Sequence, residues 1–170
     1  MTGLVGAALL TAGCAGLGLS AAGRLEGRVR DLDGLIAALE EMARELDWRQ
    51  PPLPELLERA GQAAGGRAGA FFARCAAQSG ALSGRPFRLA WEQALAGAGL
   101  RLTACDRLLL GQLGGVLGRY DGPSQSRALA QCAARLEGQR RAALERRERL
   151  GRVYTVLGVA GGALLGILLS

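Results

Sequence analysis

The sequence has no histidine and no lysine, and its 170 residues include only two Trp, two Tyr and three Phe. Without histidine the chain lacks the usual general base at neutral pH, the Ser-His-Asp and Cys-His arrangements, and the commonest side-chain ligand of metals. The scattered aromatic residues offer no platform on which nucleic-acid bases could stack. We therefore expect no nucleic-acid partner, and catalysis is left open only to paired carboxylates.

Cysteine and acidic residues add no reactive pattern. The cysteines are far apart and form no CxxC pair: Cys14, Cys75, Cys105 and Cys132. Without such a pair or a histidine there is no zinc-type ligand set. The last three lie on apolar faces of predicted helices, so we expect buried, reduced thiols. Acidic pairs such as Asp31 with Asp33 indicate exposed helix charges. The sequence thus predicts no catalytic residue, no cofactor, no metal and no small-molecule substrate.

Charge is absent from both ends of the chain. Every charged side chain lies between Arg24 and Arg152, whereas residues 2–22 and 153–170 are uncharged. Each of these two segments is close to the roughly 20 residues that a helix needs to cross a bilayer. The sequence therefore predicts an N-terminal transmembrane helix within residues 1–23, a domain over 24–152 and a C-terminal transmembrane helix over 153–170.

Arginines flank the two predicted spans on their inner sides only. Arg24, Arg28 and Arg30 follow the first span, and a second group precedes the other span: Arg146, Arg147, Arg149 and Arg152. By the positive-inside rule the central domain faces the cytoplasm. Two alternatives for the first segment are a cleaved signal peptide and a lipoprotein signal ending at Cys14, but the positively charged start that such signals carry is missing.

Small residues recur at every fourth position in both predicted spans. One stripe contains Ala8, Ala12 and Gly16, and the other contains Gly158, Gly162 and Gly166. This spacing lets two helix backbones approach closely in a membrane and predicts helix packing. The alternative is chance, because a chain with 27 glycines produces such patterns by composition alone.

The central region has helical periodicity and few β-branched residues, so we expect an all-α bundle of about six helices between the two spans. The first helix covers about 25–48, and the second is a short helix through 57–60 that prolines open and residues 61–66 close. The third covers about 67–78, and the fourth begins after Pro86. The fifth covers about 103–117 with Thr103 as its N-cap, and the sixth is capped by Ser124. The first and last are expected to continue into the spans.

The aromatic residues are expected in the domain core. Trp91 should pack against Phe71 or Phe72, and the helix over 103–117 shows a wide apolar face that includes Leu108. The predicted core residues are Phe71, Phe72, Phe87, Trp91, Leu109 and Leu113.

The order of these segments resembles the stage III sporulation protein AB family over nearly the whole chain. The likeness rests on the first apolar span with its basic exit, the helix from Leu35 to Trp48 followed by Pro52 and Leu53, and three quoted segments: AWEQAL (90–95), LLLGQLGGVLGRYD (108–121) and LGVAGGALLGILL (157–169).

This resemblance implies a non-enzymatic, membrane-anchored part of a secretion-like channel complex between the mother cell and the forespore. It also implies a place in the mother-cell membrane, partners that include a secretion-type ATPase, and similarity to the helical domains of inner-membrane platform proteins of type II secretion. The alternative is a membrane-tethered helical adaptor or regulatory protein unrelated to sporulation.

Overall fold

The computed structural model describes residues 2–80, 86–119 and 121–168, and the side chains at 2–22, 24, 80, 147 and 150–168 lie outside this description. The described residues form six α-helices and no strand, which confirms the all-helical class. The helices are α1 (Thr2–Trp48), α2 (Leu53–Ala64), α3 (Gly66–Gly80), α4 (Phe87–Gly97), α5 (Ala104–Leu113) and α6 (Gly122–Leu168).

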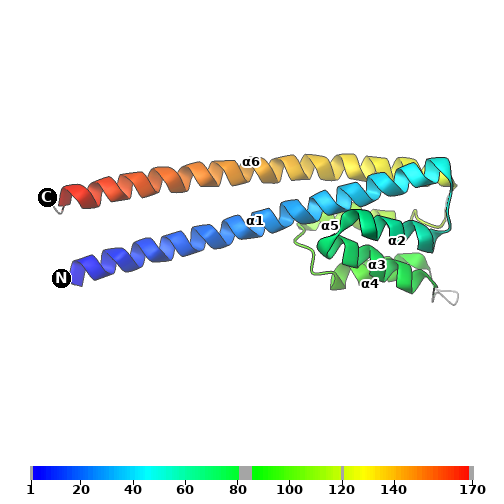
Figure 1. Ribbon diagram of the computed structural model, residues 1–170, viewed down its shortest axis with the longest axis horizontal. Coiled ribbons are helices and arrows are strands. Elements are labelled where there is room, and N and C mark those ends of the chain that lie inside the picture. The colour runs from blue at the N-terminus through cyan, green and yellow to red at the C-terminus, as the bar shows by residue number, and fades with distance from the viewer. Residues whose placement is uncertain (1, 81–85, 120, 169–170) are drawn as a thin grey trace. The chain divides into compact units, whose positions relative to one another are not determined.

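The two terminal helices are long and unbroken, with 47 residues each (Figure 1). The predicted helices of the central region therefore do continue toward both chain ends. Prolines set the start of α2, with Pro52 as its N-cap and Pro54 in its first turn, where a proline removes no helical hydrogen bond.

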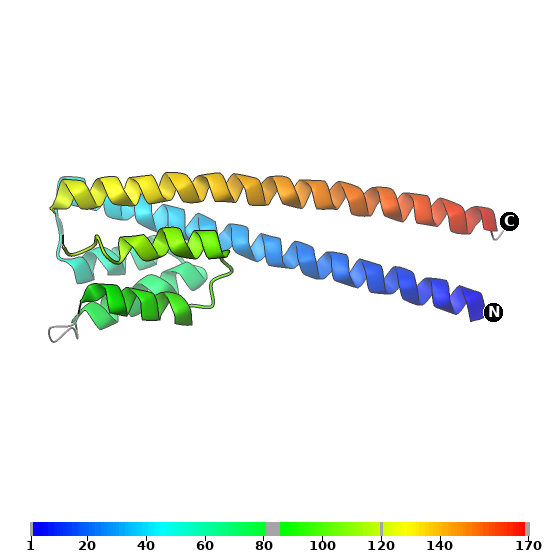
Figure 2. The same ribbon diagram turned by 180° about the vertical axis from the view of Figure 1, so that it is seen from behind.

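The chain divides into two compact units, Arg28–Arg141 and a second one that joins Met1–Gly27 to Ala142–Ser170. In the first unit, α2 to α5 gather beside the C-terminal part of α1 and the N-terminal part of α6 (Figures 1 and 2). This unit contains the hydrophobic core.

The core is built around the inner face of α1, where Leu32, Leu35, Leu39 and Met42 are fully buried. Their spacing follows the helical repeat that the sequence shows from Leu25 to Leu46. The short helices complete the core with side chains that α1 cannot supply, so the bundle depends on contacts between residues far apart in the sequence.

Aromatic side chains form the centre of the packing between α3 and α4. Trp91 is fully buried and makes edge-to-face contacts with Phe71 and Phe72, at ring-centroid distances of 4.8 and 6.0 Å. Its indole Nε1 donates a hydrogen bond to the carbonyl of Leu110 at 2.8 Å, which satisfies the one polar group of the ring. Phe87 is half-buried at the edge of this cluster.

The residues that the sequence assigns to α5 divide between core and surface. Leu110 and Leu113 are buried and Leu109 is half-buried, but Leu108 is 66% exposed and Cys105 is exposed. The expected wide apolar face and the expected burial of Cys105 are therefore wrong. Successive residues of a helix turn by about 100°, so the inward direction through Leu110 and Leu113 leaves Leu108 on the opposite side.

Glycines have a packing role between α2 and α3 that the sequence interpretation missed. Gly61 lies inside α2 instead of ending it, and a Cβ built on Gly69 would come within 2.6 Å of the Gly61 carbonyl oxygen. Only glycine permits two helix backbones to come this close. The chain reversal falls at Gly65 and Gly66, which have φ angles of +61° and +52°.

Asp121, and not Ser124, occupies the N-cap position of α6, because the helix begins at Gly122. Hydrogen bonds from Ser124 to the Asp121 carboxylate lower the pKa of that carboxyl group. Ser124, which was predicted from the sequence as the cap, lies instead in the first turn of α6 and donates a hydrogen bond to the Asp121 carboxylate.

In the part of the chain that the structure describes, no helix has a stretch that is both long enough and apolar enough to cross a membrane. The predicted spans and their stripes, with Ala8, Ala12 and Gly16 in α1 and Gly158, Gly162 and Gly166 in α6, have helical backbones, but their side-chain surroundings lie outside the described residues. The prediction that these residues pack against other helices therefore stays a prediction.

Candidate functional site

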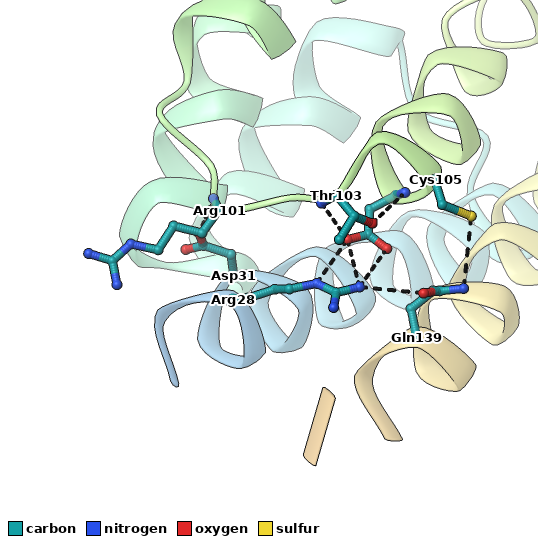
Figure 3. Close-up of polar contacts among 7 residues, drawn as sticks. Arg28, Asp31, Arg101, Thr103, Cys105 and Gln139 are labelled. Atoms are coloured by element: carbon teal, nitrogen blue, oxygen red, sulfur yellow. Dashed lines mark hydrogen bonds and ion pairs between the residues drawn. The ribbon is translucent and has the colours of Figure 1, made fainter. Parts of the chain in front are cut away.

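A buried ion pair joins α1 to the start of α5. The guanidinium group of Arg28 donates from Nε to Oδ2 of Asp106 at 3.0 Å and from Nη2 to Oδ1 at 3.1 Å, a two-pronged contact (Figure 3). The Asp106 side chain is completely buried and that of Arg28 is 10% exposed. Parallel bonds of this kind fix orientation as well as distance, so the pair sets how α1 lies against α5.

Asp106 also forms the N-terminal cap of α5 together with Thr103. The backbone N–H of Thr103 donates to Oδ2 of Asp106 at 2.9 Å, and the Asp106 N–H donates to the Thr103 hydroxyl at 3.3 Å. This reciprocal arrangement is a capping box. The Asp106 carboxylate thus accepts three hydrogen bonds, and its negative charge lies at the positive end of the helix dipole.

The same network reaches α6 through Gln139. Its side-chain oxygen accepts a hydrogen bond from Arg28 Nη2 at 3.4 Å, and its amide nitrogen lies 3.9 Å from the Cys105 sulfur (Figure 3). One arginine therefore connects three helices. Arg140, the residue after Gln139, forms an ion pair with Asp33 of α1 and so adds a second tie between α1 and α6.

A second buried carboxylate lies one helical turn after Arg28. Asp31 is 4% exposed and accepts hydrogen bonds from Arg67 Nε in α3 at 3.1 Å and from the Arg101 backbone N–H at 2.7 Å. Figure 3 shows Asp31 beside Arg101, on the loop that precedes α5. Together, Arg28 and Asp31 attach one turn of α1 to α3, to the loop before α5, to α5 and to α6.

This network corrects two interpretations made from the sequence. Arg28 was assigned to the basic flank of a membrane span, and Asp31 was taken as an exposed helix charge, yet both are buried and paired. The local signal that could have located the site is the spacing of Thr103 and Asp106, since a capping residue followed three positions later by an acidic residue is typical of a helix start. No local signal relates Arg28 to a residue 78 positions away.

The chemistry of the network favours holding helices together. Both buried carboxylates already accept hydrogen bonds from fixed donors, and the described residues include no cluster of three His, Cys, Asp or Glu that could hold a metal ion. Burial raises the pKa of the Cys75 thiol to about 12 and that of Cys132 to about 11, so both sulfurs stay protonated at neutral pH. The expectations that Cys75 and Cys132 are buried are confirmed.

Two surface grooves flank the bundle. One lies beside α2 and is polar, with a volume of about 580 Å³ and a lining that includes Glu41, Glu55, Glu58 and Arg59. Arg59 forms ion pairs with Glu45 and Glu55, and the attraction of Glu45 is the main cause that raises the pKa of this arginine. In α1, the four-residue spacing of Glu40 and Arg44 predicts an ion pair between them. Arg44 pairs instead with Glu41, three residues before it.

The second groove, between α5 and α6, has a volume of about 110 Å³ and a largely apolar floor. The lining residues are Leu109, Gln112 and Leu113 of α5, Val116 of the turn that follows, and Ala128, Gln131, Cys132 and Arg135 of α6. Two predicted core residues, Leu109 and Leu113, therefore line this groove and also pack in the core. The Cys132 thiol lies 3.7 Å from the Leu109 carbonyl oxygen, which ties the two walls together.

Comparison with known proteins identifies a matching family and a similar solved structure. The family model described as stage III sporulation protein AB matches residues 3–170. A solved structure titled Stage III sporulation protein AB is similar in fold, with a TM-score of 0.64 and 24% sequence identity over 72% of this chain and 98% of the other. No curated protein matches. Because the family model covers nearly the whole length, this chain belongs to the stage III sporulation protein AB family.

Proposed function

We propose that this protein is a non-enzymatic helical scaffold, anchored in the mother-cell membrane, of a secretion-like channel complex that serves the forespore during endospore formation. The observation that carries the proposal is the family match over residues 3–170, since the family is one of sporulation proteins. The proposed partners are other proteins of the channel complex, including a secretion-type ATPase.

The buried polar network supports a scaffold role. A scaffold must hold one surface in one orientation, and two-pronged charge pairs with short fixed bonds provide that. Arg28 and Asp31 tie four other elements to a single turn of α1. The polar side chains of this network are engaged with one another, which leaves the outer surfaces of the bundle as the regions available to partners.

The uncharged segments 2–22 and 153–170 support the proposed anchoring, as each has the length of a membrane-spanning helix. We place the central unit in the cytoplasm because arginines flank both segments on the inner side. A single cysteine at an exposed position such as Ala134, in a chain without its native cysteines, should be silent to a probe confined to the cell exterior. A cysteine at Ser170 should be labelled, and the reverse pattern would contradict the topology.

The role itself is tested by deleting the gene in an endospore-forming host and restoring it on a plasmid. Heat-resistant spores should fall by several orders of magnitude in the deletion and return with the parent gene. Purification of the tagged protein from sporulating cells in mild detergent should retain an ATPase and other membrane proteins. Normal spore counts in the deletion strain would refute the sporulation role.

A matched pair of variants tests the predicted helix packing at the C-terminal stripe. Gly162→Leu should keep the protein in the membrane, because the segment becomes more apolar, but should weaken co-purification of partners and lower spore formation. Leu165→Ile should change neither. If Gly162→Leu behaves like the parent, the segment only anchors the protein.

A further inference from the structure

The polar groove beside α2 carries more negative than positive charge. Three glutamates and one arginine line it together with two neutral residues: Glu41, Glu55, Glu58, Arg59, Gln62 and Ala63. The ion pairs of this lining add Glu45 and Arg44, so four carboxylates are accompanied by two guanidinium groups, a net charge of −2. Glu58 is exposed and has no ion-pair partner among the described residues. The groove is therefore an acidic surface that its own arginines do not neutralise.

One carboxylate of this group has an oxygen without a hydrogen-bond donor. Oε1 of Glu45 accepts a hydrogen bond from Arg59 Nη1 at 2.9 Å, whereas Oε2 of Glu45 is buried and accepts none. Arg59 divides its donors, because its Nη2 group donates to Glu55 at 2.9 Å. A buried acceptor without a donor is uncommon and destabilising. The arginines of this surface are thus too few for its carboxylates, and a further cationic donor would complete the network.

An exposed tryptophan lies on the same face of α1 as two of these glutamates. Glu41, Glu45 and Trp48 are separated by four and three residues, a spacing that places side chains on one side of a helix. Trp48 is 89% exposed, and its neighbours in the chain, Asp47 and Arg49, have opposite charges. The face of an indole ring attracts a guanidinium or ammonium group. The ring and the carboxylates therefore favour the same kind of ligand, a cationic side chain.

We propose that the groove beside α2, together with Trp48, binds a basic segment of a partner protein. One arginine or lysine of that segment covers the Trp48 ring, and another enters the groove beside Glu58. Charge complementarity identifies this occupant, since excess carboxylates and an indole ring select cationic side chains over acidic or neutral ones. A groove of about 580 Å³ has room for more than one side chain. The proposal rests only on this surface, so its failure would leave the channel role intact.

The test measures the fluorescence anisotropy of a short fluorescein-labelled peptide that alternates arginine and glycine. The peptide is titrated with the full chain in a mild neutral detergent at low salt. We expect saturable binding that weakens as salt is added, because salt screens exposed charges. The same peptide with citrulline in place of arginine keeps the shape but not the charge, and it should bind at least about tenfold more weakly.

Substitutions at two exposed positions locate the binding. Glu58→Arg should raise the dissociation constant of the arginine peptide at least about tenfold, because like charges would then meet. Trp48→Ala should raise it about twofold to tenfold through loss of the cation–π contact, and Trp48→Phe should retain part of the affinity. On α4, Glu92→Arg reverses an exposed charge and Leu89→Ala shortens an exposed apolar side chain. These two matched controls should leave the dissociation constant unchanged.

Two results would overturn the proposal. One is no binding of the arginine peptide at low salt, or equal binding of the citrulline peptide. The other is binding that either Glu58→Arg or Trp48→Ala leaves unchanged, because the proposed surface includes both side chains. Quenching of tryptophan fluorescence gives a second readout, since an aqueous quencher reaches exposed Trp48 but not buried Trp91. The arginine peptide should lower the quenchable fraction, and an unchanged fraction at saturation would contradict a contact with Trp48.

Discussion

Replacing Asp106 by alanine is expected to be the most damaging single change in the polar network. The substitution removes the acceptor of three hydrogen bonds, two from Arg28 and one from the Thr103 backbone N–H. It leaves the Arg28 guanidinium, which is 10% exposed, without its carboxylate partner. It also removes half of the capping box at the start of α5.

The expected loss of unfolding free energy is about 3 to 5 kcal/mol. Removing one member of a buried ion pair costs this much because the other charge stays buried without compensation. Loss of a capping residue alone costs about 0.5 to 2 kcal/mol, and the two effects overlap because one carboxylate causes both. Since domains of this size are stable by roughly 5 to 15 kcal/mol, this loss should remove between about a fifth and all of the stability of the Asp106→Ala protein.

Arg28→Met removes the ion pair but leaves the capping box of α5 in place, so it separates the cost of the lost ion pair from the cost of the lost cap. Methionine keeps an unbranched stem to pack on and Asp106 still accepts from Thr103, but the buried Asp106 carboxylate loses its charge partner, so the cost should again be about 3 to 5 kcal/mol. The double variant Arg28→Met, Asp106→Ala has no unpaired buried charge. It should therefore cost less than the sum of the single variants by at least about 1.5 kcal/mol.

The assay is denaturant unfolding of the full chain in mild detergent, followed by the near-ultraviolet circular dichroism of Trp91, which is packed against Phe71. Glu92→Ala is the control, because its carboxylate pairs with Arg88 on the exposed side of α4 and should contribute less than about 0.5 kcal/mol. A cost for Asp106→Ala that equals the control, or a double variant that is strictly additive, would refute the reasoning.

Further predictions concern packing and thiol reactivity. Trp91→Ala should lower the unfolding free energy by about 3 to 5 kcal/mol in the same assay, and an unmoved transition would contradict the observed burial. Gly114→Ala should cost about 1 to 3 kcal/mol, because the new Cβ would lie 2.7 Å from the Trp91 ring. Gly111→Ala, three residues earlier and with nothing within 4 Å, should instead stabilise by about 0.5 to 1 kcal/mol, and equal effects at the two glycines would refute this account. A thiol reagent at pH 8, with labelling mapped by mass spectrometry, should modify exposed Cys105 well before Cys75, whose pKa is raised to about 12 by burial, and equal rates would contradict the structure.

Features that depend on neighbouring residues could be read from the sequence. The helical repeat from Leu25 to Leu46 predicted the buried face of α1, Pro52 and Pro54 predicted the start of α2, and Thr103 was correctly assigned as the cap of α5. The expected contact of Trp91 with the two phenylalanines is also present.

The errors share a cause. Cys105, Leu108 and Asp31 were placed by residue type and local pattern, but each lies at a position where the direction of burial is set by an element distant in the sequence. At the start of α5, Asp106 takes the inward position that an apolar side chain would be expected to fill, because Arg28 of α1 is there to pair with it. Cys105 is turned outward as a result.

By itself, the sequence determined the helical class, the starts of α2 and α5 and the uncharged character of both chain ends, since propensity, capping and hydrophobicity act over a few residues. Only the tertiary structure decided which charges are buried, which glycines allow helices to touch and where a groove is left open. These depend on which side chains meet across the bundle, and Arg28 and Asp106, which are 78 positions apart, leave no local trace of their contact in the sequence.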